Sequence, residues 1–338
     1  MRRWAGRMAV GLCACMALCA VLGGCGNARA RQVQGFAMDT LITLTVYDDA
    51  GETAAKACLS ALSAWEDDFS AQRAQGQLGA LNAAGQGTLS GEAATLFVQA
   101  MQWAQDTRGA FDPALGQLIA LWHVQTREAE EPLPTQEAID AARAASGSAL
   151  VQWHRQGDGS VAVQLKDGAQ LDLGGIAKGY AADLCAQLLA QQGVTDAIVN
   201  LGGNVRILGQ RAHTVGVQDP RNAQRILLQL DAADESVVTS GDYQRYVEVD
   251  GQRIHHVLDA RTGRCADSGL ISVTVVGHDG AACDALSTAV LVLGAQEGLA
   301  LLARTGYEGI LVTRDRQVLV TQGLKERVAL LSDAYTMP

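Results

Sequence analysis

The feature that most constrains the fold of this chain is the shortness of the turns that join its predicted strands. Apolar, strand-like runs at 149–154 and 160–165 are separated by Gly157-Asp158-Gly159, a third run follows at 169–173, and Asp250-Gly251 lies between two further runs. Turns of this length join antiparallel neighbours, because a parallel pair needs a crossover of about a dozen residues or more. We therefore predict sheets that are mainly antiparallel.

The predicted helices come in separate runs and do not alternate regularly with the strands. Helical spacing of apolar residues, or an alanine-rich run that ends at glycine, occurs at 55–69, 91–107, 115–122, 135–146, 176–192, 281–293 and 295–305. Further strands are expected at 36–47, 196–201 and 270–276, with paired strands up to about residue 321. This order favours an α+β architecture, with mainly antiparallel sheets and packed helices, over a doubly wound parallel fold.

The amino-terminal residues have the organisation of an export signal. Three arginines within the first seven residues precede an apolar stretch, 8–22, that is too short to span a membrane as a mature helix. The stretch ends in Leu22-Gly23-Gly24-Cys25, which resembles the lipobox of bacterial lipoproteins, cleaved before a cysteine that then carries the lipid. An ordinary signal peptide, cleaved near Ala28 or Ala30, is the alternative.

These signals divide the chain into three parts. We expect a signal peptide over 1–24, a tether over 25–34 that begins with lipidated Cys25, and one folded domain over 35–338. The protein would then be exported and anchored through its lipid to a bacterial membrane, facing the periplasm or the cell exterior.

The expected mature chain is acidic. Loss of the signal removes three arginines and no acidic residue, so the formal net charge of −10 becomes −13. An acidic protein gains nothing from counterion release on a polyanion, and we therefore exclude nucleic acid as a partner. Any phosphate ligand must be held locally, by a metal ion or by a few directed donors.

Four cysteines remain in the expected domain: Cys58, Cys185, Cys265 and Cys283. Cys58 and Cys185 occupy apolar positions of predicted helices, where we expect small core residues. No CxxC pair occurs, so we expect no structural zinc, and the spacing assigns no disulfide.

One segment has the pattern of an anion site. Gln170-Leu-Asp172-Leu-Gly174-Gly175-Ile-Ala-Lys178 runs from a predicted strand through two glycines into a predicted helix. Glycines let the backbone approach a ligand, the first turn of a helix offers unpaired N–H groups, and Lys178 adds a full charge. A phosphate would fit there, although the same pattern also serves as an ordinary connection between strand and helix.

A second pattern is typical of a hard-cation site. Asp284 and Thr288 are four residues apart in a predicted helix, so the carboxylate and the hydroxyl share a face. Oxygen ligands of this kind suit Mg²⁺. The pair alone is weak evidence, because such residues also occur without function at the start of a helix.

Two adjacent histidines follow a predicted hairpin. Neighbouring side chains on a strand point in opposite directions, so His255 and His256 do not readily bind one ion together. We interpret His256 as a single directed donor, acceptor or base, and expect His255 at the surface. Asp259 and Thr262-Gly263 have the pattern of a structural turn.

These segments occur in the order and approximate spacing of the ApbE family, which the chain resembles from about residue 33 to its end. The six matching segments are Ala37-Met38-Asp39-Thr40, Ala110-Phe111-Asp112-Pro113, 172–179, 199–204, 256–263 and Asp284-Ala-Leu-Ser-Thr288. The resemblance implies a T-fold-like architecture and an FAD:protein FMN transferase. Such an enzyme splits the pyrophosphate of its substrate FAD with Mg²⁺, moves FMN onto a threonine hydroxyl of an acceptor protein and releases AMP.

The resemblance also implies roles for single residues. Asp284, Thr288 and the backbone carbonyl of Gly175 would hold the metal, and His256 or Asp284 would accept the threonine proton. The residues expected to contact FAD are Met38, Gln72, Ala110, Phe111, Asp112, Asp172, Lys178, His256 and Leu258. Expected acceptors carry a flavinylation threonine motif and include subunits of sodium-pumping NADH:quinone reductases, Rnf-type complexes and exported flavin reductases.

Two positions depart from the family pattern. Asp39 replaces the usual glycine and places a carboxylate near the flavin, and Gln72 stands where many members have a tyrosine that stacks on the flavin. These changes bear on the balance between transfer and hydrolysis. The alternatives are therefore a Mg²⁺-dependent FAD pyrophosphatase, which would give FMN and AMP, and a non-catalytic FAD-binding lipoprotein.

Overall fold

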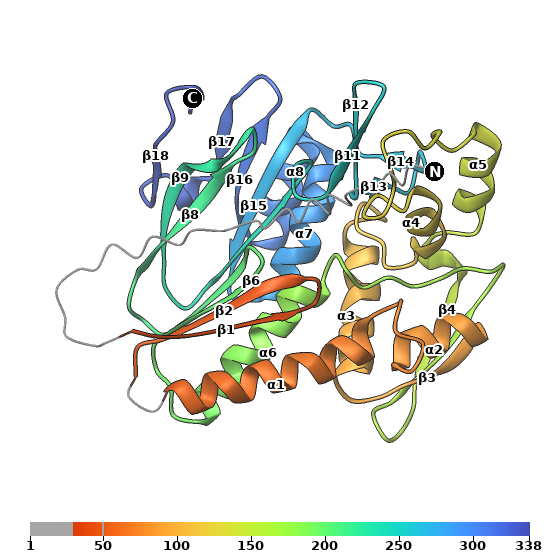
Figure 1. Cartoon of the computed structure of the whole chain (residues 1–338), viewed down its shortest axis with the longest axis horizontal. Helices are drawn as coiled ribbons and strands as arrows, with labels where there is room; N and C mark the ends of the chain where they lie inside the picture. The colour runs from red at the N-terminus through yellow and green to blue at the C-terminus, as the bar shows by residue number, and fades with distance from the viewer. Residues whose placement is uncertain (1–29, 49–50) are drawn as a thin grey trace, which may run out of the picture.

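The largest element of the fold is an eight-stranded sheet in which each neighbouring pair of strands is antiparallel (Figure 1). The computed structural model describes residues 30–48 and 51–338. In spatial order the strands are β1 (Arg31–Ala37), β2 (Thr40–Val46), β6 (Ala197–Leu201), β7 (Asn204–Leu208), β10 (Ser236–Gly241), β15 (Leu270–Gly277), β16 (Glu308–Thr313) and β17 (Val318–Val320).

Smaller antiparallel sheets accompany the large one. One contains β18 (Val328–Leu330), β9 (Asn222–Ala232) and β8 (His213–Asp219), and another contains β3 (Gln86–Leu89), β5 (Val161–Leu165) and β4 (Val151–Arg155). Two hairpin-like pairs complete the set: β11 (Tyr246–Val249) with β12 (Gln252–His255), and β13 (Leu258–Asp259) with β14 (Arg264–Cys265).

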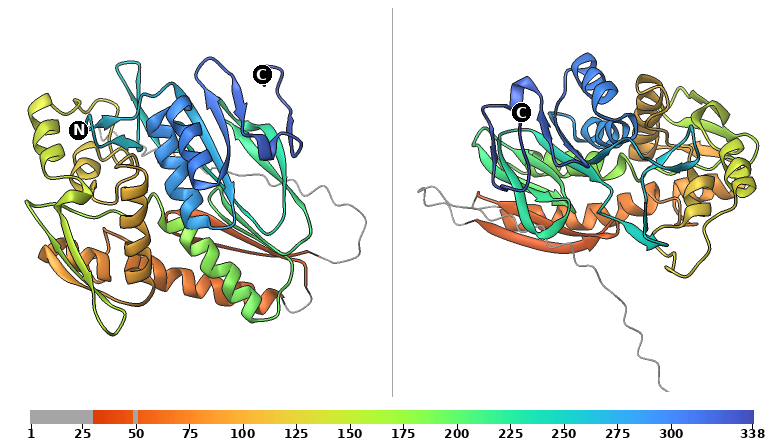
Figure 2. Two further views of the ribbon diagram at one scale, coloured as in Figure 1. Left: turned by 180° about the vertical axis from the view of Figure 1, so that it is seen from behind. Right: turned by 90° about the horizontal axis from the view of Figure 1, so that it is seen from above.

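The helices gather mainly on one side of the large sheet. They are α1 (Gly51–Phe69), α2 (Gln77–Ala84), α3 (Gly91–Asp106), α4 (Gly116–Trp122), α5 (Gln136–Ala144), α6 (Ala177–Gln191), α7 (Gly280–Leu293) and α8 (Ala295–Thr305). Figure 2 shows α6, α7 and α8 on that side, and α6 and α7 contact each other as well as the sheet.

Alternation along the strands explains this layering. In β6, Ala197, Val199 and Leu201 are buried in a cluster with α1 and α6, whereas Ile198 is buried in a cluster with the β8–β9–β18 sheet. The central strands thus have apolar residues on both faces, since helices cover one face and a second sheet covers the other.

The predicted α+β class with mainly antiparallel sheets is confirmed. The seven predicted helices are present with boundaries within a few residues of the prediction, whereas α2 was not predicted. The strand predicted at 169–173 is wrong: this extended segment pairs with no strand. The Asn82 side chain serves its backbone instead, donating to the carbonyl of Leu171 and accepting from the Leu171 N–H, both at 2.8 Å. Backbone groups of Pro113 and Gly116 bond Asp172 and Gln170, so one amide side chain and a loop replace a strand partner.

The strand predicted at 36–47 is confirmed over Thr40–Val46 as β2, but its start is wrong, because the chain turns back at Met38-Asp39 to form the β1–β2 hairpin. β1 starts at Arg31, so residues 31–34 of the predicted tether belong to the sheet. The predicted signal peptide and Cys25 lie outside the described residues. Across the described part of the chain, no helix combines the length and the apolar character needed to cross a membrane.

Candidate active site

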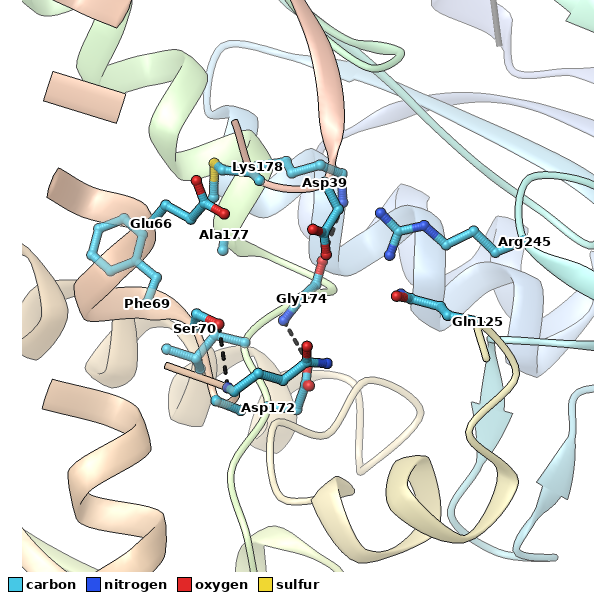
Figure 3. Close-up of a pocket in the computed structure, with 14 residues that line it drawn as sticks. Asp39, Glu66, Phe69, Ser70, Gln125, Asp172, Gly174, Ala177, Lys178 and Arg245 are labelled. Atoms are coloured by element: carbon cyan, nitrogen blue, oxygen red, sulfur yellow. Dashed lines mark hydrogen bonds between the residues drawn. The ribbon is translucent and has the colours of Figure 1, made fainter. Parts of the chain in front are cut away.

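An open pocket lies where the β1–β2 turn, the end of α1, the start of α6 and the segment after β10 meet (Figure 3). Four of the residues predicted to contact FAD line it: Met38, Gln72, Asp172 and Lys178. Segments far apart in the sequence therefore converge on one pocket.

The turn that enters the pocket has an uncommon backbone conformation. Met38 and Asp39 are the two central residues of the β1–β2 hairpin, and their φ angles are 52° and 57°. Two positive φ values match the type I′ turn, whose twist suits a hairpin and whose second position favours glycine. Aspartate tolerates this conformation better than most side chains. Asp39 therefore fits the turn, and its carboxylate lines the pocket.

The start of α6 forms the floor of the pocket. The half-buried Asp172 carboxylate accepts a hydrogen bond from the Gly174 N–H at 2.8 Å, and Lys178 Nζ donates to the Gly174 carbonyl at 3.2 Å. Desolvation raises the pKa of Asp172, while the Gly174 N–H and the charges of Lys178 and Arg245 act in the opposite direction. Desolvation outweighs these opposing effects, so the pKa of Asp172 lies above its ordinary value.

Helix α7 meets α6 directly behind this floor. The buried Asp284 accepts a hydrogen bond through Oδ2 from the Gly179 N–H at 3.0 Å, so one donor of the first turn of α6 is taken by a carboxylate of the protein. Gly179 is required there: a Cβ at this position would lie 2.0 Å from the Gly280 carbonyl oxygen and 2.9 Å from the Asp284 Cβ. The helix start is thus less an open anion cradle than part of a junction between two helices.

The other predicted metal ligands lie at the same junction. A Cβ built on Gly175 would be 3.6 Å from Thr288 Oγ1 and 3.2 Å from the Phe111 ring, so these three residues are neighbours. Ser240, at the end of β10, contacts Thr288 Oγ1 at 3.4 Å and Ser287 Oγ at 2.7 Å.

The donor set at this junction suits a magnesium ion better than a transition metal. In residues 30–48 and 51–338, no cluster of three or more His, Cys, Asp and Glu side chains could hold a metal. One carboxylate, one hydroxyl and one backbone carbonyl are hard oxygen donors, and Mg²⁺ commonly combines a few such donors with water and substrate phosphates. Asp284, Thr288 and Gly175 therefore fit the ion predicted for them.

His256 lies beside the pocket and is connected to it through Arg245. Its backbone N–H and its Nδ1 both face the Arg245 carbonyl, at 3.2 and 3.3 Å. A carbonyl only accepts, so Nδ1 carries the proton and Nε2 keeps its lone pair. Burial, followed by the charges of Arg245, His255 and Lys178, lowers the pKa of His256 to about 3. His256 is therefore neutral at pH 7.

Besides His256, four predicted FAD contacts do not line the pocket. Ala110 and Phe111 are buried, and Leu258 is buried in a separate cluster with Leu118 and Trp122. Both oxygens of Asp112 accept backbone N–H groups, from Ala114 at 2.8 Å and Ser148 at 2.9 Å. Asp112 thus acts as a loop cap in this conformation, and Phe111 supports the Gly175 backbone from behind.

The expectation that His255 lies at the surface is wrong. Its side chain is buried at 6% exposure, Nε2 bonds the Ala266 carbonyl at 3.0 Å, and Nδ1 has no partner among the described residues. Burial lowers the pKa of His255 as well. Strand alternation separates it from His256, but the segment around Ala266 covers its face too.

Sequence reasoning missed three residues near the pocket: Ser240, Arg245 and Gln125. Ser240 follows the apolar strand residues Val237-Val238, and a polar residue at the end of a buried strand is the one available signal. Arg245 and Gln125 lie in irregular segments, where composition gives no signal of what they face.

Known protein families and curated proteins resemble this chain in sequence. The model of the ApbE family matches residues 38–311. The chain belongs to the ApbE family. A curated family member from Treponema pallidum (strain Nichols), named FAD:protein FMN transferase, is 35% identical, with 97% of each chain covered. A second of the same name, from Klebsiella pneumoniae (strain 342), is also 35% identical and covers 88% of this chain and 94% of its own.

Solved ApbE structures have the same fold. The ApbE protein of Thermotoga maritima superposes with a TM-score of 0.80 at 30% identity, over 87% of this chain and 98% of the other. The apo form of the flavinyl transferase ApbE of Pseudomonas stutzeri gives a TM-score of 0.73 at 29% identity, over 85% and 92%. The ApbE-like architecture predicted from the motifs is therefore confirmed.

Proposed function

We propose that this protein is a Mg²⁺-dependent FAD:protein FMN transferase, which moves FMN from FAD onto a threonine hydroxyl of an acceptor protein and releases AMP. Membership of the ApbE family and the names of relatives matched over nearly the full chain support the transferase class. The observation that carries the proposal is the convergence of Asp284 and Thr288 of α7 on Gly175 and Gly179, next to a pocket lined by Asp172 and Lys178.

The reaction exchanges one phosphorus–oxygen bond for another. The threonine oxygen attacks the phosphorus that carries the flavin, its bond to the bridging oxygen breaks, and that oxygen leaves with AMP. Little covalent chemistry is asked of the protein, so positioning and charge stabilisation dominate. Mg²⁺, held by Asp284, Thr288 and the Gly175 carbonyl, would supply positive charge to the pyrophosphate.

The remaining residues of the site have complementary roles in this proposal. Lys178 adds a second positive charge beside the pocket floor. His256 keeps an unprotonated Nε2, and an anionic substrate would raise its low pKa toward a useful range. We assign it, ahead of Asp284, to accept the threonine proton, because Asp284 Oδ2 already accepts from Gly179.

One observation favours a second candidate, a Mg²⁺-dependent FAD pyrophosphatase. Gln72 lines the pocket at the position where a tyrosine would stack on the flavin, and an amide holds a flavin less firmly than an aromatic ring. A loosely held flavin phosphate is more open to water. Hydrolysis would then compete with transfer.

The test is incubation of the purified mature domain with FAD, Mg²⁺ and a peptide that carries a flavinylation threonine motif. Covalent flavin fluorescence on the peptide, lost on addition of EDTA and in Asp284→Ala, supports the transferase. Free FMN and AMP without labelled peptide supports the pyrophosphatase. Unchanged FAD would leave only a binding function and would contradict both.

Location and partners follow from the same proposal. We infer export and lipid anchoring through Cys25, and acceptors among exported flavoprotein subunits of the three classes named above. Radiolabelled palmitate incorporated by the wild type and not by Cys25→Ser would support the anchor. Release of Cys25→Ser from the membrane fraction would support it independently.

A further inference from the structure

Arg245 is the charged residue of the pocket that no sequence motif assigns. It follows β10 and precedes β11, and it lines the pocket together with Lys178 and Asp172. In Figure 3 its side chain points into the pocket from the side opposite Glu66 and Phe69. It therefore reaches the space where the substrate would lie.

The guanidinium of Arg245 has no ion pair or side-chain hydrogen bond within the described ranges, unlike two nearby arginines. Arg253, on β12, lies 3.4 Å from Glu248 and 3.7 Å from Asp242. Arg221 lies 2.7 Å from Asp242. The N–H groups of a half-buried guanidinium without a protein partner can donate hydrogen bonds to an anionic ligand.

The backbone of Arg245, and not its side chain, makes the contacts that hold this segment in place. Its carbonyl accepts from the His256 N–H at 3.2 Å and faces Nδ1 at 3.3 Å, which fixes the segment after β10 against the strand that ends at His255. The side chain is not needed for that contact. Its removal should therefore leave the fold of the hairpin intact.

The charges that line the pocket show what the guanidinium contributes. Glu66 is paired with Arg73 at 2.7 Å, which leaves the carboxylates of Asp39 and Asp172 against the cations of Lys178 and Arg245. Without Arg245 the lining would carry net negative charge and would repel a pyrophosphate. The carboxylate of Asp39 lines the pocket and increases the negative charge that a cation must offset there.

We propose that Arg245 binds a phosphate of the substrate FAD and offsets the carboxylate of Asp39. This inference rests on the proposed function and adds a substrate contact to it. Arginine suits the role because its planar group donates two parallel hydrogen bonds to a phosphate. Lys178, in the first turn of α6, would supply the second cation.

The test measures flavin binding in EDTA, so that neither metal nor turnover contributes. The probes are FAD, FMN and riboflavin, titrated by flavin fluorescence against wild type, Arg245→Ala and Arg245→Lys. A charge-assisted hydrogen bond predicts about a 10- to 100-fold rise in Kd for FAD and FMN in Arg245→Ala, with a smaller rise in Arg245→Lys. Riboflavin, which has no phosphate, should bind all three proteins equally.

Two control variants sharpen the result. Arg253→Ala removes an arginine that is paired elsewhere, and should leave the three Kd values unchanged. Asp39→Asn removes the opposing charge and should lower the Kd for FAD and FMN severalfold. Unfolding midpoints of Arg245→Ala and Arg253→Ala that match the wild type establish that the fold is intact.

Different outcomes overturn different claims. Equal Kd values for FAD in wild type and Arg245→Ala, or an equal loss of riboflavin binding, would overturn the role of Arg245 and leave the transferase proposal standing. Failure of the wild type to bind FAD at all would overturn both.

Discussion

At the scale of single residues, the site contains two groups, Asp172 and His256, whose pKa values differ from their ordinary values. Burial raises the pKa of Asp172, and burial together with the charge of Arg245 lowers the pKa of His256 to about 3. Both shifts arise mainly from burial in a poorly hydrated pocket, and the positive charge there adds to the shift of His256 but opposes that of Asp172. A phosphate ligand would raise the pKa of His256, because it adds negative charge near the ring.

The shift at His256 predicts a pH dependence of stability. A histidine whose folded pKa is about 3 and whose unfolded pKa is about 6.5 binds its proton only in the unfolded state between those values. Its contribution to stability is complete above about pH 6.5 and declines as the pH falls toward 3. The urea midpoint of the wild type should therefore fall more between pH 7.5 and 5 than that of His256→Gln.

Comparison with the variant removes the contributions of other titrating groups, including His255 and the buried carboxylates. Parallel midpoint curves for wild type and His256→Gln would show that His256 is not depressed in the folded protein. Its role as a neutral acceptor would then have to be abandoned.

The sequence predicted the direction of single side chains better than their surroundings. Alternation along the strand correctly separated His255 from His256, but it could not predict that the segment at Ala266 buries His255. The alternation of side chains along a strand is a local property of the sequence. The residues that cover a strand come from elsewhere in the sequence and cannot be predicted from that alternation.

At the scale of elements, the crossing of α6 and α7 places the predicted metal ligands. Gly179 lets the helices approach until its N–H reaches Asp284, and Asp183, one turn further along α6, accepts the N–H groups of Gly280 at 2.7 Å and Ala281 at 3.2 Å. Asp183 also lies 3.5 Å from Arg206 of β7. Each helix thus caps the other, and the sheet holds the pair.

Gly179→Ala should separate the two helices. The added methyl group has no space between the Gly280 carbonyl and Asp284, and overpacking of this kind costs about 1–3 kcal/mol. We expect a lower unfolding midpoint and loss of Mg²⁺-dependent turnover. Gly157→Ala is the matched control, since a Cβ there meets nothing within 4 Å and its stability should be nearly unchanged.

Asp183→Ala should weaken the start of α7. Two N–H groups lose their acceptor, and loss of such a cap typically costs about 1–2 kcal/mol. The measurement is urea unfolding at pH 8, because burial and Asp279 raise the pKa of Asp183 to about 7. Asp140→Ala, at an exposed position, should change stability by less than about 0.5 kcal/mol. Equal effects of the two substitutions would argue against the capping role.

The elements themselves were largely predictable, because helical periodicity and the glycines that end helices lie within or next to each element in the sequence. The failures have a common cause. The segment 169–173 looks like a strand, but its backbone bonds the Asn82 side chain and the loop at 113–116. The β1–β2 turn lies at Met38-Asp39, where no glycine marks it. In both places a side chain, a loop or an unusual backbone conformation substitutes for the ordinary signal.

At the scale of the whole molecule, the layered fold brings the functional segments to one place. The segment at 172–178 and the helix residues Asp284 and Thr288 are more than a hundred positions apart in the sequence, yet they meet behind one pocket. The motifs named these residues, but the order of strands that joins them could not be read from spacing. Arg245 became visible only once β10 was placed beside β7 and β15.

The central claim is that this site transfers FMN with the help of Mg²⁺. The most direct measurement is mass spectrometry of an acceptor peptide after incubation with the purified protein and FAD. We expect the wild type with Mg²⁺ to add the mass of FMN less one water at threonine, with AMP released in equal amount. Neither EDTA-treated protein nor Asp284→Ala should label the peptide. Labelling that persists without Mg²⁺ and without Asp284, or AMP and FMN released with no labelled peptide, would contradict the account.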